Sequence, residues 1–283
     1  MMGMRHNLIP RWYSFLGDIS VIAKVLAELL PDMPDRGGRG RPPKHPAKEY
    51  LGLIVTKELK KASLRDAETD WSHCICGERV DHAVIHYWEK HIPPEVVEQA
   101  VRTIGSALEE VLGYDFTVID ATAFADWHHG TTSFHVVTRI AQGTVYPVSM
   151  CHDTLDPIPN ARDAIIPGSG LFMGDKWYDV NGVFRIVYKS GYTPLIKPQR
   201  TRGSGRWRRR GRRAFDMEWR TYRQRGRGES PFGSLTNAFG DRLHTRMDET
   251  TYTRCAARVI AYQIKIYIRA TGKGIVSITL VIS

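Results

Sequence analysis

The sequence predicts an α/β domain with a partly antiparallel sheet, preceded by an all-α region. Before about residue 114 the apolar residues recur at helical spacing, and after it short apolar, β-branched runs alternate with turn residues. Three strand-like runs follow one another directly, and helix and strand patterns then alternate, which is typical of a mixed sheet. We therefore expect one domain over residues 1–114 and a second over residues 115–283.

Helical patterns occupy the first region. They cover residues 18–32, 47–62, 81–91 and 94–113. Asp18 is suited to cap the first of them, and Pro94 and Gly113 suit the first turn and the end of the last. The breaker run RGGRGRPPKHP separates the first two. Short helices beside a basic linker favour a DNA-binding domain of the helix-turn-helix type, although no single segment stands out as the recognition helix.

Strand patterns dominate the second region. We expect five strands, at residues 115–124, 134–143, 144–153, 171–179 and 192–198. Helical patterns lie at 180–191 and 252–270, and the apolar tail at 274–283 is typical of one more strand. No apolar run reaches the roughly 18 residues needed to cross a bilayer. The N-terminus also lacks the pattern of a signal peptide, so we expect a cytoplasmic protein with no membrane segment.

Four cysteines are scattered along the chain, which argues against a disulfide framework. Two of them lie in the run HCIC at 73–76, where too few ligands stand at a useful spacing for a zinc site. We expect these thiols to be free.

The net charge of +10 lies in one segment. Residues 199–228 contain twelve arginines and two acids, and the rest of the chain holds as many acidic as basic side chains. A solvated basic loop usually mixes lysine with acids, whereas arginine interleaved with tryptophan and tyrosine favours a surface that binds phosphate. The expected nucleic-acid contacts include three consecutive arginines, Arg208, Arg209 and Arg210.

Two aspartates follow apolar runs of the predicted sheet. Asp120 follows FTVI and Asp175 follows LFMG. Either one alone is explained by capping a turn or pairing with arginine, since an unpaired buried charge is costly. Together with a third carboxylate from a later helix, they are suited to hold two Mg²⁺ ions about 4 Å apart. Asp126 is an alternative ligand on the first strand, and Asp153 is better explained by capping.

The third carboxylate is Glu229, which stands at the end of the arginine-rich segment. Gly226 and Gly228 weaken a helix before it, and Ser230 followed by Pro231 is typical of an N-cap and a first helical position. We therefore expect a helix that begins near Ser230, or is sharply kinked there, with Glu229 at its mouth. A helix N-terminus also favours bound phosphate.

These residues resemble a known family. Tyr222, Arg225 and Glu229 have the spacing of the Y-(2)-R-(3)-E-(6)-K signature of insertion-sequence DDE transposases. VIDATAF around Asp120 resembles the first-aspartate motif, and GDKWYD around Asp175 resembles the second, DKGYD. RVIAYQIKIYI is similar to the family's closing helix, and the resemblance extends back to about Gly38 through RGRPPKHPAKEYLGLIVTKELKKASLRDAE.

The resemblance implies a fold and a site. The second domain would be an RNase H-like mixed sheet flanked by helices, with an arginine-rich insertion at about 199–228. Asp120, Asp175 and Glu229 would be the catalytic, metal-binding triad. The expected DNA contacts near the cleaved end are Tyr222, Arg225 and Lys176. The chain departs from the pattern twice, because the signature lysine falls on Thr236 and the small residue of the second motif is Trp177.

A second DNA contact is expected in the linker of the first domain. RGRP resembles the core of an AT-hook, in which Arg39 and Arg41 would lie in a narrow minor groove. A plain basic linker explains the same residues equally well, and both interpretations stay open.

The activity implied is cleavage at the ends of a mobile element and strand transfer into target DNA, using two Mg²⁺ ions, or Mn²⁺ in their place. The partners would be double-stranded DNA, as terminal inverted repeats and as target, and a second copy of the chain in a homodimer on DNA. The location implied is the nucleoid. Two alternatives remain: an RNase H-like nuclease without strand transfer, and a decayed, non-catalytic DNA-binding remnant.

Overall fold

The computed structural model describes residues 18–32, 42–126, 130–200, 205–240, 242–243 and 245–272. Three of the predictions lie outside these residues: the minor-groove contacts of Arg39 and Arg41, and the strand at 274–283. Among the described residues, none of the helices is both long enough and apolar enough to cross a bilayer.

The sheet has the five predicted strands in the order β3-β2-β1-β4-β5. Their bounds are β1 Phe116–Ala125, β2 Thr131–Ala141, β3 Thr144–His152, β4 Leu171–Gly174 and β5 Thr193–Ile196. The first three pair antiparallel, whereas β4 runs parallel to both β1 and β5. The mixed sheet is consistent with the RNase H-like fold that the resemblance implies.

The N-terminal part is helical, as predicted. The predicted helices are α2 Ile19–Leu29, α3 Ala47–Lys60, α6 His82–His91 and α7 Pro94–Leu112. Asp18 caps α2 by accepting a hydrogen bond from the Ser20 amide, and Gly113 ends α7 with a positive φ of 61°. The prediction missed a stretch of short helical turns, α4 Leu64–Asp66, η1 Ala67–Trp71 and α5 Ser72–Cys76. These turns are too short to establish a helical period in the sequence.

The C-terminal part contains the remaining helices. They are α8 Pro157–Ala164, η2 Lys176–Tyr178, α9 Asn181–Lys189, α10 Arg206–Tyr222, α11 Arg225–Gly228, α12 Ser230–Phe239 and α13 Asp248–Thr271. The fourth strand is shorter than predicted, because it ends at Gly174 and a 3₁₀ turn follows. Part of the arginine-rich segment, Arg206–Tyr222, forms the helix α10, and neither α10 nor α8 was predicted.

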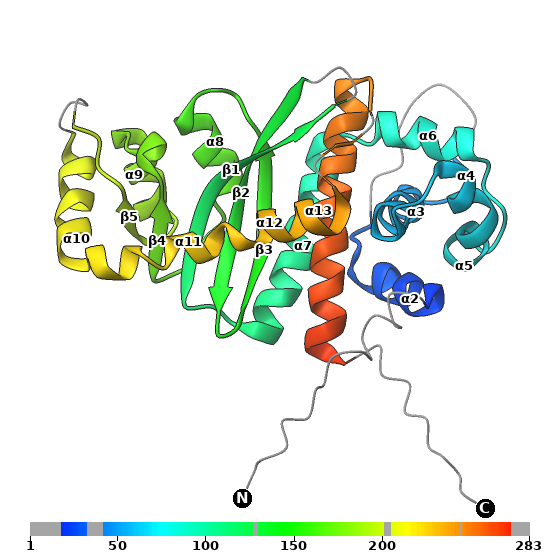
Figure 1. Cartoon of the computed structure of the whole chain (residues 1–283), viewed down its shortest axis with the longest axis horizontal. Helices are drawn as coiled ribbons and strands as arrows, with labels where there is room; N and C mark the ends of the chain where they lie inside the picture. Colours follow the sequence, from blue (N-terminus) through cyan, green and yellow to red (C-terminus); the bar gives the residue numbers. More distant parts are fainter. Residues whose placement is uncertain are drawn as a thin grey trace, which may run out of the picture.

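Helices cover both faces of the sheet (Figure 1). On one face α7 and α13 pack on β3, and α7 approaches it so closely that a Cβ on Gly105 would lie 2.6 Å from the Val148 backbone. On the other face a small cluster that includes Val118, Met173 and Leu195 lies under α10. Helix α13 also contacts α3 and α6, so it stands between the sheet and the N-terminal helices (Figure 1).

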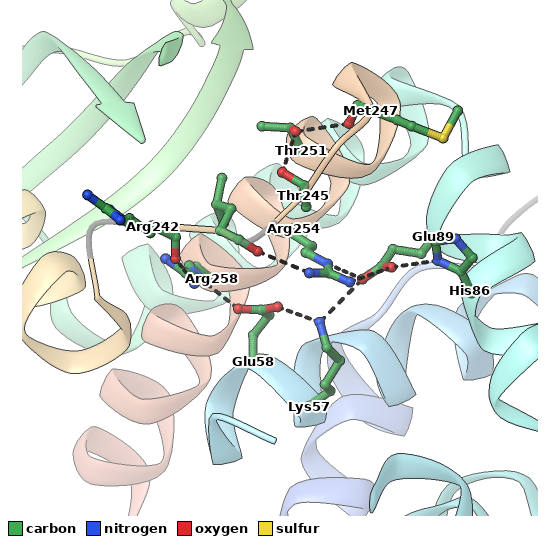
Figure 2. A network of polar contacts seen from close by, with 11 residues as sticks. Lys57, Glu58, His86, Glu89, Arg242, Thr245, Met247, Thr251, Arg254 and Arg258 are labelled. Carbon is green, nitrogen blue, oxygen red and sulfur yellow. Dashed lines mark hydrogen bonds and ion pairs between the residues drawn. The ribbon is translucent and has the colours of Figure 1, made fainter. Parts of the chain in front are cut away.

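Buried charges join α13 to the N-terminal helices (Figure 2). The carboxylate of Glu89, on α6, is fully buried and receives hydrogen bonds from Arg254 of α13 at 2.5 and 3.0 Å. Lys57 of α3 lies between Glu89 and Glu58, and Glu58 accepts a hydrogen bond of 2.8 Å from Arg258. Each carboxylate therefore faces two cations, which offsets the cost of removing it from water.

Arg254 and Arg258 also form hydrogen bonds with the backbone that follows α12. Arg258 donates to the carbonyl oxygens of Gly240 and Arg242, and Arg254 donates to that of Leu243. The Leu243 amide in turn donates to the carbonyl of Ala125 at the end of β1, at 3.0 Å. The network thus connects the N-terminal helices with the chain just after α12 and, through it, with the end of β1.

We predict that Arg254→Ala lowers the free energy of unfolding by about 3–5 kcal/mol, because it leaves Glu89 buried with too little positive charge. Urea unfolding at neutral pH measures this loss. Arg65→Ala, at an exposed position of α4, is the control and should change stability by less than about 0.5 kcal/mol. Equal effects of the two substitutions would contradict the proposed importance of the network.

The same network predicts a pH dependence. Burial would raise the pKa of Glu89, but the hydrogen bond from His86 and the charges of Lys57 and Arg254 outweigh burial and lower this pKa to about 2. Because the folded pKa lies below the ordinary value of 4.5, ionised Glu89 stabilises the fold above about pH 4.5 and this contribution is lost as the pH falls towards 2.

The stability difference between the wild type and Glu89→Gln should therefore narrow as the pH is lowered from 4.5 towards 2. Urea unfolding at several pH values tests this, with Glu110→Gln at an exposed position of α7 as the matched acid-to-amide control. A difference that stays constant with pH would show that Glu89 does not titrate with a lowered pKa.

Candidate active site

Asp120 and Asp175 lie at the same level of two neighbouring strands. The parallel register of β1 and β4 pairs Val118 with Met173, and each aspartate follows two residues later. Because side chains alternate along a strand, Asp120 lies on the same face of the sheet as Val118. That is the face on which α10 and α11 pack.

Helix α11 brings Glu229 to this face. Gly228 lies directly on β1, because a Cβ there would be 2.7 Å from Cγ1 of Val118. Three residues earlier, Arg225 Nη2 donates to Asp120 Oδ1 at 3.1 Å, and Arg225 Nη1 donates to Glu229 Oε1 at 2.7 Å. One guanidinium therefore bridges the first and third of the expected metal ligands.

The predicted helix start is largely confirmed. Helix α12 begins at Ser230, but its N-cap is Glu229, and Pro231 occupies the second helical position. Glu229 also ends α11, with helical φ and ψ of −80° and −19°, so the chain passes from one helix to the next at the carboxylate itself. Thr236 is exposed on α12, and its hydroxyl donates to the carbonyl of Phe232.

The three carboxylates influence one another. Burial raises the pKa of Asp120, the charge of Arg225 lowers it, and the charges of Glu229 and Asp175 raise it again, so the net shift is upward. The side chains of Asp120 and Arg225 are each 18% exposed, whereas Glu229 is 53% exposed. Asp175 accepts a hydrogen bond from the Trp177 amide at 2.8 Å. Clustered negative charge of this kind favours bound cations.

The donor set fits a hard divalent ion such as Mg²⁺, because all three side chains offer carboxylate oxygens. In this structure the carboxylate oxygens of the three residues do not all lie within 4.8 Å of one another. Among the described residues, two other groups of possible metal ligands do lie that close together. The charge of Arg225 instead compensates Asp120 and Glu229. Ion binding would thus require the guanidinium to give up these two contacts.

The expected DNA contacts differ in their placement. Lys176, Arg209 and Arg210 are exposed. Tyr222 is half-buried, and its hydroxyl donates to the carbonyl of Gly174 at 3.1 Å, next to Asp175. It therefore helps to hold the end of β4, and burial raises the pKa of its phenol to about 12.

Arg208 is too deeply buried to make the DNA contact that the sequence predicted for it. Its side chain is 2% exposed and is ion-paired with Asp179, which is fully buried. The guanidinium also donates to the carbonyl of Gln199 at 3.0 Å. The prediction treated the three consecutive arginines alike, but a helix turns each residue by about 100°, so Arg208 faces the sheet while its two neighbours face solvent.

The predictions missed a buried polar cluster under the second-aspartate motif. His135 of β2 is 2% exposed and its ring nitrogens face the Tyr178 hydroxyl and, at 3.1 Å, Oδ1 of Asp153. Burial lowers the pKa of His135. The indole of Trp177 stacks on this imidazole with ring centroids 5.0 Å apart. A histidine inside the apolar run FHVV was the one signal in the sequence.

Arginines on the outer side of α10 form a basic surface. Arg206, Trp207, Arg209, Arg210 and Arg213 line a hollow there. Further along the helix, Trp219 is 46% exposed, with the guanidinium of Arg223 5.2 Å from its ring centroid. Exposed indole beside arginine is the combination that binds nucleic-acid phosphates and stacks on bases.

Comparison with known proteins gives one match. A family model described as the transposase DDE domain matches residues 115–264, which is more than half of the chain. The match begins at the first residue before β1 and ends within α13, so it includes Asp120, Asp175 and Glu229. Neither the curated proteins nor the solved structures include a match to the chain.

We predict that Gly228→Ala lowers the free energy of unfolding by about 1–3 kcal/mol, because the added methyl group overpacks the contact between α11 and Val118. Gly226→Ala is the matched control: it lies in the same short helix and its Cβ would meet nothing within 4 Å. Alanine there should be neutral or stabilise the helix by up to about 1 kcal/mol. Urea unfolding compares the two, and equal stabilities would refute the close packing of α11 on β1.

Proposed function

The chain belongs to the transposase DDE domain family, and on this basis we propose that it cuts DNA at the ends of a mobile element and joins the freed 3′-hydroxyl to target DNA. The family implies a DNA substrate and divalent metal ions. The observation that carries the proposal is the guanidinium of Arg225, which bridges Asp120 and Glu229 and also feels the charge of Asp175, although these acids come from three distant parts of the chain.

In this proposal Asp120, Asp175 and Glu229 hold the metal ions. Two bound Mg²⁺ ions, or Mn²⁺ in their place, would supply an activated water or 3′-hydroxyl on one side of a phosphodiester and stabilise the leaving oxygen on the other. The protein's own residues position the ligands. Tyr222 ties the end of β4, and Asp175 is held by the amide of Trp177.

Arg225 has two roles in this scheme. Without ions it neutralises Asp120 and Glu229, which keeps the half-buried carboxylates together. When the ions take over that charge, the guanidinium is free to donate to a DNA phosphate, for which its planar fork is well suited. Lys176, exposed directly after Asp175, is a second candidate for a backbone contact.

We further propose that the exposed arginines of α10 bind flanking or target DNA and that residues 1–114 recognise the element ends. The basic, tryptophan-containing surface of α10 supports the first part. The helical structure of the N-terminal part is compatible with the second. Synapsis of two ends implies a homodimer on DNA and an association with the nucleoid.

The test uses duplexes made from the inverted repeats that flank the coding sequence, in uncut and pre-cut form. We predict that Asp120→Asn, Asp175→Asn and Glu229→Gln each lower Mg²⁺-dependent cleavage and joining by more than about 100-fold, because losing even an outer-shell partner costs 10–100-fold. Binding of the duplex should be retained. Asp163→Asn, an exposed acid-to-amide change on α8, is the control.

The same assay separates the alternatives. Cleavage of uncut duplex without any joined product from pre-cut duplex would favour an RNase H-like nuclease. Duplex binding with no cleavage in the wild type, unchanged by Glu229→Gln, would favour a non-catalytic DNA-binding remnant, which Thr236 in place of the signature lysine already suggests as an alternative.

A further inference from the structure

A second group of metal-binding side chains lies far from the carboxylate site, in the N-terminal helices. His45 precedes α3, Glu49 is in the first turn of α3, and Cys76 is the last residue of α5. One ligand atom from each of the three lies within 4.8 Å of the other two. All three residues are half-buried, and Cys76 packs against the hydrophobic core.

The side chains of this group are close together, and the Cys76 thiol interacts with the Glu49 carboxylate as a hydrogen-bond partner. His45 Nδ1 is 3.2 Å from Glu49 Oε2, and His45 Nε2 is 2.7 Å from Oε1 of a fourth residue, Glu78. Even so, both His45 Nε2 and Glu49 Oε2 are buried atoms without an aligned hydrogen-bond partner. Buried polar atoms normally have one. Donor atoms that lie close together without pointing at each other are typical of ligands arranged around a common centre.

The chemistry of the donors selects the kind of ion. Imidazole nitrogen, thiol sulfur and carboxylate oxygen are together the ligands of Zn²⁺, and a thiolate makes Mg²⁺ or Ca²⁺ an unsuitable occupant. We propose that His45, Glu49 and Cys76 bind a zinc ion. A water would complete the four ligands that zinc prefers.

Binding displaces a proton from the thiol. The thiolate forms a bond to zinc as this proton is released to solvent. Oε2 of Glu49, which has no aligned hydrogen-bond partner, becomes a ligand in the same step.

Another group of three residues, Glu68, Asp81 and His82, also lies close enough together to hold an ion. Its central carboxylate is already satisfied, because Glu68 accepts hydrogen bonds from Arg79 at 2.9 Å and from the His82 amide at 3.1 Å. It also lacks sulfur. The geometry therefore points to the cysteine-containing group alone.

The ion would fasten the start of α3 to the end of α5. The helices α3 and α5 lie next to each other in space, but the short turns α4 and η1 stand between them in the sequence. A zinc ion at this point acts as a cross-link between two segments that share little regular structure. It also holds the residues that directly follow the basic RGRP run.

The experiment titrates the metal-free full-length protein with Co²⁺, which substitutes for zinc and reports a thiolate ligand by a charge-transfer absorption band. We predict one equivalent of Co²⁺ bound with this band, displaced by Zn²⁺. Cys74→Ser, an exposed cysteine two residues away, is the matched control and should keep the band. Cys76→Ser should abolish it, and Glu49→Gln should weaken Co²⁺ binding at least tenfold.

Thermal unfolding gives an independent readout. Addition of Zn²⁺ should raise the unfolding midpoint of the wild type and of Cys74→Ser but not that of Cys76→Ser. If Cys76→Ser does not fold, His45→Gln takes its place in both measurements. A wild type without the thiolate band, or a band that survives both Cys76→Ser and His45→Gln, overturns the proposal. The group would then be a metal-free cluster in which His45 pairs with two carboxylates. Neither measurement involves DNA cleavage, so the outcome is independent of the proposed transposase activity.

Discussion

The candidate site depends on one guanidinium between two carboxylates. Asp120 projects from the middle of a buried strand, and its like-charged neighbours Glu229 and Asp175 oppose its ionisation. Arg225 supplies the compensating charge at 3.1 and 2.7 Å from Asp120 and Glu229. Without it, three acids on one face of the sheet would repel one another and the short helix that carries Glu229 would lose its polar contact with β1.

Two backbone features place the carboxylates on the same face of the sheet. Parallel pairing of β1 and β4 sets Asp120 and Asp175 at one level. The glycine at 228 lets α11 lie on Val118 without a side chain between them. The arginine network around α13 then holds the chain beyond α12 and connects it with α3 and α6. The N-terminal helices α3 and α6 are thereby packed on the same long helix, α13, that covers the sheet.

The arginine-rich segment illustrates how one composition serves two purposes. Arg208 is buried against Asp179 and fixes α10 to the end of the sheet, near the second-aspartate motif. Its neighbours on the opposite side of the helix are exposed and line a hollow beside Trp207. A structural anchor therefore orients the basic surface, so that the exposed arginines of α10 are presented from a defined helix.

The sequence by itself determined the element types and the order of the motifs. Apolar periodicity and β-branched runs are local properties, which is why the five strands and most of the long helices could be predicted, whereas α10, whose residues are mainly arginine, was not. The spacing of Tyr222, Arg225 and Glu229 was equally readable. The start of the helix at Glu229 was readable to within one residue from Ser230 and Pro231, although the cap is Glu229 and not Ser230.

Only the tertiary structure decided which side chains face one another. Nothing local distinguishes Arg208 from Arg209, but the helix face that packs on the sheet buries one and exposes the other. His135 reaches Tyr178, and His45 reaches Cys76, across 43 and 31 residues of sequence, so these contacts depend on how separate elements pack. Local periodicity carries no information about such partners, because they are set by the register of the sheet and the docking of helices upon it.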